Sequence, residues 1–500
     1  MEKKSFHLPT RREFIRKSCL AVGTISVAQT IRDLRLINSA AAQETFSDYK
    51  ALVCVFLGGG NDSNNLIVPR SGADYSNYSA IRQNLALPAD SLLPIYPDNS
   101  DGRDYGLHPG CVELERLFNG RPNVDPQLVE DPKLAVLFNV GPLVYPLTRA
   151  QYSANSVAKP PQLFSHSDQV THWQTSLPDQ PPRTGWGGRI ADLLHPDQLD
   201  LINGLPGSAA AKIALCTSIA GNNTFEVGGN YQQYHVGTNG AVLMNGVIDN
   251  RLQAVKDILS IPSNIVSNLQ RQAYADVAER ALATGTLLNG AISNTDPVKF
   301  PNYWTVPFPG SNGLADQLRM VARIIEGRGP FELNMRRQIF YVTDGGYDTH
   351  TSQVKDNGAD PADRLLGEHA TRLTRVSKAL FAFQKAMEQL GLDDQVTTFT
   401  ASDFGRTFRT NGQGSDHGWG SHHLIMGGAV RGRRIYGTFP TLQTNGPDAV
   451  PTSNEGRWIP TTSVDQYSAT LARWFGVSDS NLPTVFPNIG RFAEMENFMF

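Results

Sequence analysis

A run of seven apolar residues, Ala51–Leu57, ends in three consecutive glycines that are followed by Asn61 and Asp62. The run is apolar at every position rather than at alternate positions, which is typical of a strand buried on both faces of a parallel sheet. Glycine permits a positive φ and a close approach of the backbone. The pattern therefore predicts a central strand with Asp62 at its carboxyl end, the edge at which open α/β sheets bind ligands.

Further strand-like runs alternate with helical stretches, many of which are bounded by Pro or Gly. This alternation favours an α/β fold, a three-layer sandwich with a mostly parallel central sheet. We expect one large domain over residues 43–500, with loop insertions at 87–106, 142–182 and 221–244. Strands are predicted over 51–57, 134–140, 213–217, 338–343, 396–400 and 424–426, and helices over 109–118, 265–292, 314–326, 362–390 and 463–475.

The first 42 residues have the layout of an export signal. Residues Thr10–Lys17 resemble the twin-arginine translocation motif, Cys19–Val27 is moderately apolar, and Ser39–Ala42 offers small residues for signal peptidase. The apolar stretch is too short, and too soon followed by charges, for a stable membrane span. This predicts export by the twin-arginine translocase to the periplasm or the extracellular space. The alternative is a chance Arg-Arg pair in a basic helix.

Charge and cysteine content limit the classes of partner. Residues 1–42 carry eight Lys/Arg and three Asp/Glu, a net of +5, so the chain's net charge of −3 leaves −8 on the rest. A mildly acidic protein lacks the basic surface that nucleic acid requires, so we expect no nucleic-acid partner. The spacing of the cysteines beyond the signal resembles neither a zinc ribbon nor a disulfide scaffold. Cys54 and Cys216 lie in apolar runs and are predicted to be buried small hydrophobes.

A second polar cluster, Asp344–His350, follows the strand predicted over 338–343. Here Asp348 stands two residues before His350, a spacing that places both side chains on one side of an extended turn. Carboxylate and imidazole together suit Zn²⁺, Mn²⁺ or Fe. Alternatively, the carboxylate fixes the tautomer of the histidine, or the segment is an ordinary surface turn.

A third cluster follows the strand predicted over 396–400. Asp403 comes at the strand end, and the Arg406 guanidinium matches the geometry of phosphate or sulfate, unless it pairs with Asp403. Asp416 and His417 follow in a Gly-rich loop. Five of the ten histidines outside the signal lie in or beside these turns, namely His166, His350, His417, His422 and His423.

Ser165 and His166 open another candidate segment, which follows a long loop. A serine here caps a short helix, or serves as a nucleophile helped by the positive end of the helix dipole. The candidate catalytic residues are therefore Ser165, His166 and Arg406.

Taken together, these segments resemble the exported bacterial family called domain of unknown function 1501. The block at Asp416–Gly418, followed by 425–428 and 434–437, is the most specific part. The other matching stretches are 10–17, 56–69, 164–169, 348–353 and 402–407. The resemblance implies the alkaline-phosphatase-like superfamily, which includes sulfatases, with a mostly parallel sheet and two metals at its carboxyl edge.

The resemblance also implies roles for single residues. Asp62 resembles the metal-binding aspartate after the first strand, Asp348 and His350 resemble a metal-binding pair, and His417 or His422 resembles the late metal-binding histidine. Asp403 sits where the superfamily usually has an Asp-His pair, but the next residue here is Phe404 instead of histidine. A full two-metal site therefore requires Asp416 and His417 to substitute. Divalent metal ions are therefore expected, with zinc, manganese, calcium and magnesium not distinguished.

Two main hypotheses for function follow. The first is an exported metal-dependent hydrolase that acts on phosphate or sulfate esters, with a small or polymeric anionic substrate. Neither Cys-x-Pro-x-Arg nor Ser-x-Pro-x-Arg occurs, which disfavours a formylglycine sulfatase. The second is a non-catalytic binding or assembly protein that keeps the fold. A redox or cofactor protein is a third idea, suggested only by the export route.

Overall fold

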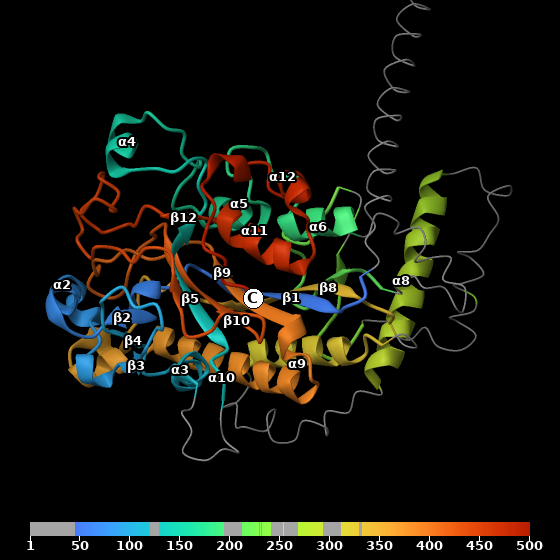
Figure 1. Ribbon diagram of the computed structural model, residues 1–500, viewed down its shortest axis with the longest axis horizontal. Helices are drawn as coiled ribbons and strands as arrows, with labels where there is room; N and C mark the ends of the chain where they lie inside the picture. The colour runs from blue at the N-terminus through green and yellow to red at the C-terminus, as the bar shows by residue number, and fades with distance from the viewer. Residues whose placement is uncertain are drawn as a thin grey trace, which may run out of the picture.

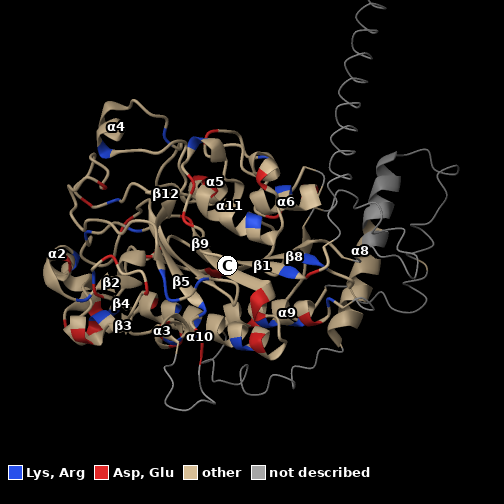
Figure 2. Cartoon of the chain, viewed as in Figure 1, with Lys and Arg blue, Asp and Glu red and all other residues tan. Residues whose placement is uncertain are grey.

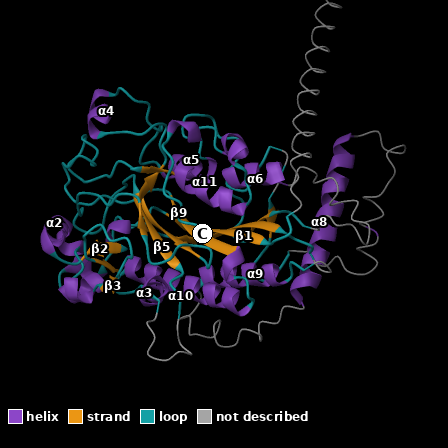
Figure 3. Cartoon of the chain, in the orientation of Figure 1, coloured by secondary structure: helices purple, strands orange, loops and turns teal. Residues whose placement is uncertain are grey.

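The structure is a computed structural model that describes residues 46–120, 130–194, 213–229, 231, 233–241, 254, 269–293, 312–329 and 333–500. The predicted signal at 1–42 and part of the predicted loop at 221–244 lie outside the described residues. A single large sheet runs through the described part, with helices on both faces (Figures 1 and 3).

The central sheet has the strand order β11-β5-β10-β9-β1-β8-β6-β7, and β12 pairs with β5. Every pairing is parallel except the two made by β10. Gly58 pairs with Gly345 and Leu57 with Ser402, so the carboxyl ends of β1, β8 and β9 meet at one edge. The strands are β1 Lys50–Gly58, β5 Leu134–Gly141, β6 Cys216–Ser218, β7 Tyr234–His235, β8 Arg337–Gly345, β9 Val396–Ser402, β10 Ser421–Met426, β11 Ile435–Tyr436 and β12 Thr462–Ser463.

Helices cover the sheet on both faces (Figure 1). On one face lie α3 (Val112–Asn119), α9 (Gly313–Glu326) and α10 (Glu368–Gln389), and α8 (Leu269–Ser293) contacts α9 beyond the end of the sheet. On the other face lie α5 (His166–Thr175), α6 (Trp186–Leu194), α11 (Val464–Phe475) and α12 (Leu482–Val485). Successive side chains of β1 enter the two cores alternately, with Val53 and Val55 in one and Cys54 and Phe56 in the other. The predicted three-layer α/β sandwich with a mostly parallel sheet is confirmed.

The helix predicted over 362–390 is interrupted. A 3₁₀ helix, η7 (Pro361–Leu365), precedes α10, and Gly367 lies between them with a φ of +119°. A Cβ on Gly367 would stand 2.7 Å from the Gln353 carbonyl oxygen and 2.7 Å from the Val354 Cα. The chain therefore turns sharply at this glycine, where it packs against the loop that follows β8, instead of continuing one long helix.

Two segments predicted as irregular contain short elements. Residues 87–106 carry β3 (Leu93–Ile95) and the start of β4 (Tyr105–Leu107), which form a small sheet with β2 (Ile67–Pro69) beside α2 (Gly72–Arg82). Residues 142–182 carry α4 (Arg149–Ala154) and α5. These elements are too short to give a clear periodicity in sequence. Strand β10 begins three residues earlier than predicted, which places His422 inside it.

The structure tests the expectation drawn for two of the cysteines. Cys54, Cys111 and Cys216 are free and buried, as predicted for Cys54 and Cys216. Acidic and basic residues are interspersed along the described elements (Figure 2). None of the helices in the described ranges combines the length and the apolar character needed to cross a bilayer.

We expect Asp465→Asn to stabilise the protein at pH 8 but not at pH 4. Asp465 lies in the first turn of α11, and burial raises its pKa from 3.8 to about 7. The pKa of Asp465 is higher in the folded state than in the unfolded state. Its contribution to the free energy of unfolding is therefore fully present below about pH 4 and is lost as the pH rises towards 7. The asparagine variant should therefore gain up to about 4 kcal/mol in free energy of unfolding at pH 8. Urea denaturation at both pH values measures this, and an equal effect at both would contradict it.

Candidate metal centre

The turn after β1 packs directly beneath the loops that follow β8 and β9. Gly59 has a φ of +113°, and a Cβ there would stand 2.5 Å from the Asp348 backbone nitrogen. Gly60 has a φ of +82°, and a Cβ there would stand 2.4 Å from the Phe404 ring. The close backbone approach predicted from the glycines is confirmed, and it brings three strand ends into one site.

Three imidazoles and one carboxylate converge at this edge, and we name them the His-Asp cluster: His166, Asp348, His350 and His417. The Nε2 of His417 lies 3.1 Å from Nε2 of His166 and 2.9 Å from Nε2 of His350. Asp348 Oδ1 lies 3.1 Å from Nε2 of His350 and 3.3 Å from Nε2 of His417. Its Oδ2 lies 3.4 Å from Nε2 of His166.

The opposite nitrogen of each imidazole binds a hydrogen-bond acceptor. The acceptors are Asp403 Oδ2 for His166 at 2.7 Å, Asp416 Oδ1 for His350 at 2.6 Å and the Phe164 carbonyl for His417 at 2.7 Å. Each Nδ1 must therefore donate, and a neutral ring then leaves its Nε2 with a bare lone pair. Lone pairs and a carboxylate oxygen that face one another at about 3 Å repel unless a proton or cation lies among them. Metal-binding histidines have this arrangement of outer hydrogen bonds.

The distances suit a small divalent ion. A tetrahedral shell with metal–nitrogen bonds of about 2.0–2.1 Å has ligand atoms about 3.3 Å apart. Among the described residues, His166, Asp348 and His417 form one group whose ligand atoms all lie within 4.8 Å of one another. His350 adjoins this group through His417 and Asp348. The residues present therefore fit a metal site with three or four protein donors.

Arg406 supports the cluster from below. Its side chain is 0% exposed. Nη1 donates to Asp348 Oδ1 at 2.8 Å and to the Gly59 carbonyl at 3.3 Å. Nη2 donates to the Ser415 carbonyl. Partial burial opposes ionisation of Asp348, but the hydrogen bond and charge of Arg406 lower the pKa of Asp348. Arg406 therefore keeps this carboxylate ionised and has no face open to a substrate, unlike the anion-binding role considered from the sequence.

The histidines of the cluster differ in basicity. The hydrogen bond that His166 donates to Asp403 raises the pKa of His166, despite partial burial. Burial lowers the pKa of His417. His417 therefore stays neutral, and available as a ligand, to lower pH than His166.

The Phe164 carbonyl is a component that sequence reasoning missed. Phe164 has a φ of +74°, an uncommon conformation for a non-glycine residue, and this aims its carbonyl at His417. The Arg457 guanidinium lies 4.4 Å from the Phe164 ring centre, and its Nε donates to the His417 carbonyl at 2.8 Å. A positive φ at phenylalanine leaves no signal in a sequence.

Asp62, which the resemblance implies as a metal ligand, forms an ion pair with Arg82 in the structure and is not a member of the His-Asp cluster. The Asp62 side chain is 0% exposed. Oδ1 accepts from Asn64 Nδ2 at 3.2 Å, and Oδ2 accepts from both Arg82 and Gln353. Gln353 in turn accepts from Ser415 Oγ at 2.6 Å. Asp62 is thus linked to the cluster indirectly, because the Ser415 carbonyl accepts from Arg406 and Arg406 donates to Asp348.

His422 and Phe404 also depart from the expected metal site. His422 is buried in β10, where its Nδ1 accepts from the Asn139 backbone and its ring packs against Phe138 and Phe439. Burial lowers the pKa of His422 to about 3. It is a core histidine outside the cluster. Phe404 lies with its ring 4.7 Å from both the His166 and the His417 rings, so an apolar group occupies this side of the cluster.

The remaining candidates lie close to the cluster but have different partners. Asp403 and Asp416 accept hydrogen bonds from Nδ1 of His166 and His350, so they orient these imidazoles and are not members of the cluster. Ser165 precedes α5, as expected for a capping residue, yet its side chain makes no capping hydrogen bond. Its Oγ instead donates to Asp168 Oδ2 at 2.6 Å.

Comparison with known proteins adds a family match for part of the chain. Residues 319–483 match the family model described as "Protein of unknown function (DUF1501)". The DUF1501 match includes Asp348, His350 and His417, and it agrees with the resemblance found in the sequence. No curated protein matches the chain.

Two solved structures are similar over most of their length. One is the C-terminal periplasmic domain of EcEptC from Escherichia coli, with 12% identity over 90% of this chain and 89% of that chain, and a TM-score of 0.30. The other is the same domain in complex with Zn, with 11% identity over 92% of this chain and 94% of that chain, and a TM-score of 0.30.

We expect Asp403→Asn to weaken metal binding by about 10- to 100-fold, the usual effect of removing an outer hydrogen-bond partner. Asp403 accepts from His166 Nδ1 and, through its other oxygen, from the Gly59 backbone nitrogen at 3.0 Å. An asparagine has one carbonyl oxygen and cannot accept both. Competition against a chelating dye measures the affinity. Asp479→Asn, whose side chain is 80% exposed, is the control, and equal affinities for the two variants would contradict the prediction.

Proposed function

We propose that this protein is a metal-dependent hydrolase of phosphate or sulfate esters. The observation that carries the proposal is the His-Asp cluster, in which four donors converge while outer acceptors hold the imidazoles in the metal-binding tautomer. The side chains of Asp348 and His350 are 44% and 40% exposed, so a substrate can reach the cluster. A metal bound for structure alone is usually enclosed by its ligands.

The donor set favours zinc, followed by manganese or iron, because imidazole suits these ions while calcium and magnesium prefer oxygen ligands. A bound divalent ion supplies Lewis-acid polarisation of the ester oxygens and neutralises their charge. The chain's own residues orient the ligands, and Arg406 keeps Asp348 anionic. A metal held in this way would put positive charge at the exposed edge of the sheet.

Ser165 is our proposed nucleophile. Its Oγ donates to Asp168 Oδ2, and Asp168 can accept the proton when Oγ forms a bond to phosphorus or sulfur. The bond to the ester oxygen breaks in the same step, and that oxygen takes a proton from solvent and leaves as the alcohol. Water then hydrolyses the serine ester, releases phosphate or sulfate and restores Ser165.

The location and organisation of the chain are part of the proposal. The pattern in residues 10–42 supports export by the twin-arginine translocase to the periplasm or the extracellular space. Residues 43–500 then form a single domain with loop insertions.

The test uses the full chain, stripped with a chelator and reloaded with zinc or manganese. We expect hydrolysis of p-nitrophenyl phosphate or p-nitrophenyl sulfate that depends on the metal. Ser165→Ala should lower kcat by at least about 100-fold with unchanged metal content, because it removes the nucleophile. Ser167→Ala is the matched control. Absence of turnover with either metal, or full activity of Ser165→Ala, would refute the corresponding part of the proposal.

One observation favours a second candidate, a non-catalytic protein that binds anions through its metal. Arg406 was the cationic residue expected to stabilise transferred charge, and it is buried under Asp348. Stoichiometric metal without turnover, together with binding of inorganic phosphate or sulfate, would support this candidate.

A further inference from the structure

A cavity of about 780 Å³ opens on the α5 side of the sheet. Among its lining residues are two valines and six residues with neutral polar side chains, namely Gln174, Asn222, Asn223, Thr224, Gln233 and Tyr341. Among the described residues that line it, the Tyr341 phenol is the one ionisable group. We name this feature the amide cavity.

Helix α5 connects the amide cavity to the His-Asp cluster. His166, Val170 and Gln174 follow one another at intervals of four, so they lie on the same side of the helix. With a rise of 1.5 Å per residue, Val170 and Gln174 lie about 6 and 12 Å along the helix from His166. Val170 and Gln174 both line the cavity. The cluster and the cavity are therefore neighbours along one helix face.

Strand β8 makes the same connection from the sheet. Tyr341 of β8 accepts a hydrogen bond from Gln174 Nε2 at 3.2 Å, and the same strand leads on to Asp348. Burial is the main cause that raises the pKa of Tyr341, and the Asp403 carboxylate, which binds His166, contributes to it. Tyr341 therefore joins the wall of the cavity to the strand that precedes Asp348.

The walls of the amide cavity are held in place before any ligand arrives. Gln174 Oε1 accepts from the backbone nitrogens of Thr224 and Phe225 at 2.8 and 3.2 Å. Asn223 Nδ2 donates to Gln233 Oε1 and to Glu226 Oε2, both at 2.8 Å. Burial raises the pKa of Glu226 to about 8, so this neighbouring acid is mostly uncharged at pH 7.

We propose that the amide cavity binds the uncharged, hydroxyl-rich alcohol portion, a sugar or polyol, of an ester whose charged group lies at the His-Asp cluster. The inference rests on the proposed function. Amides and hydroxyls both donate and accept, as sugar hydroxyls do. A hydrocarbon group would form no hydrogen bonds with the Asn222 amide and the Thr224 hydroxyl, and a charged group would find no opposite charge among the described residues of the wall.

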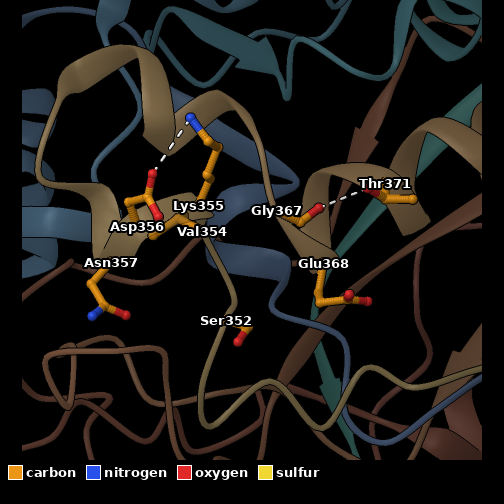
Figure 4. Close-up of a pocket in the computed structure, with 8 residues that line it drawn as sticks. All are labelled: Ser352, Val354, Lys355, Asp356, Asn357, Gly367, Glu368 and Thr371. Atoms are coloured by element: carbon orange, nitrogen blue, oxygen red, sulfur yellow. Dashed lines mark hydrogen bonds and ion pairs between the residues drawn. The ribbon is translucent and has the colours of Figure 1, made fainter.

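A second cavity near the cluster has a different character (Figure 4). It measures about 530 Å³ and is lined by Ser352, two residues after His350, and by the charged side chains of Lys355, Asp356 and Glu368. Lys355 pairs with Asp356 at 3.5 Å. Its charged walls suit a neutral ligand less well than the amide cavity does. Thr371 also lines this second cavity, so its replacement is a matched control for replacement of Thr224.

The test compares the double variant Asn222→Leu/Thr224→Val with wild type. The first measurement is saturation-transfer NMR with three neutral probes, methyl α-glucoside, methyl α-mannoside and glycerol, and it requires no turnover. We expect at least one probe to bind wild type, and the double variant to bind it about 10-fold more weakly, because two neutral hydrogen-bonding groups are lost. Thr371→Val should bind it as wild type does. No binding of any probe, or equal binding by the double variant, would overturn the inference.

The second measurement is the ratio of kcat/KM for glucose 1-phosphate to that for p-nitrophenyl phosphate. The double variant should lower this ratio about 10-fold, because p-nitrophenol offers few hydroxyls to the cavity. A ratio lowered by Thr371→Val instead would assign the alcohol to the cavity of Figure 4 and overturn the inference. If no ester is hydrolysed, the proposed function fails, whereas the NMR result still decides on the amide cavity.

Discussion

Replacing His417 with alanine is expected to remove bound metal from the protein. His417 Nε2 lies within 3.3 Å of a donor atom on each of the other three members of the His-Asp cluster. Loss of an outer hydrogen-bond partner alone weakens metal binding by about 10- to 100-fold, so loss of a central ligand should exceed about 100-fold. Elemental analysis after dialysis against metal-free buffer measures the effect, and ester hydrolysis should fall with the metal content.

The control for this experiment is His235→Ala. His235 is exposed in β7 and is not a member of the cluster. Its replacement therefore tests whether loss of an unrelated histidine also lowers the metal content. Circular dichroism establishes that both variants are folded. Equal metal content in folded His417→Ala and in wild type would rule out the proposed centre.

Replacing Asp62 with alanine is expected to destabilise the protein by about 3–5 kcal/mol and to leave its metal content unchanged. The variant would leave the Arg82 guanidinium buried without its carboxylate, and an uncompensated buried charge has a cost of this size. Arg82 and Asp62 both have 0% side-chain exposure. Urea denaturation of the metal-free protein measures the free energy of unfolding, and elemental analysis of the folded variant measures the metal.

Two further variants separate the possible causes. Asp104→Ala removes an ion pair with Arg70 that is exposed to solvent, and should cost no more than about 1 kcal/mol. The double variant Asp62→Leu/Arg82→Met removes both buried charges and should recover much of the loss. A folded Asp62→Ala protein that has lost its metal would instead make Asp62 a ligand, as the family resemblance implies.

The sheet could be predicted because its strands are buried on both faces. Burial on both faces requires an apolar residue at every position, as in Ala51–Leu57. The residues that follow such parallel strands then lie at the carboxyl edge of the sheet. Asp348 and His350 share one loop after β8, so their proximity follows from their spacing alone. The convergence of His166 and His417 is different, because it depends on a contact between residues 251 positions apart.

The remaining site details depend on partners that a single sequence does not reveal. The buried pairing of Asp62 requires Arg82, which closes α2, to point inwards, and an arginine is usually exposed. His422 and His423 look alike in sequence, and both become core residues once β10 starts at Ser421. The roles of Asp403 and Asp416 follow from which ring nitrogen each one meets, and only the three-dimensional arrangement fixes that.

The ligands of the proposed centre come from three separate stretches of chain, near residues 166, 348 and 417. An unfolded polypeptide has no such chelate, so the ion binds only the native state, and its capture and the folding reaction form one linked equilibrium. Each tenfold increase in free metal above the dissociation constant should then add about 1.4 kcal/mol to the stability of the native state.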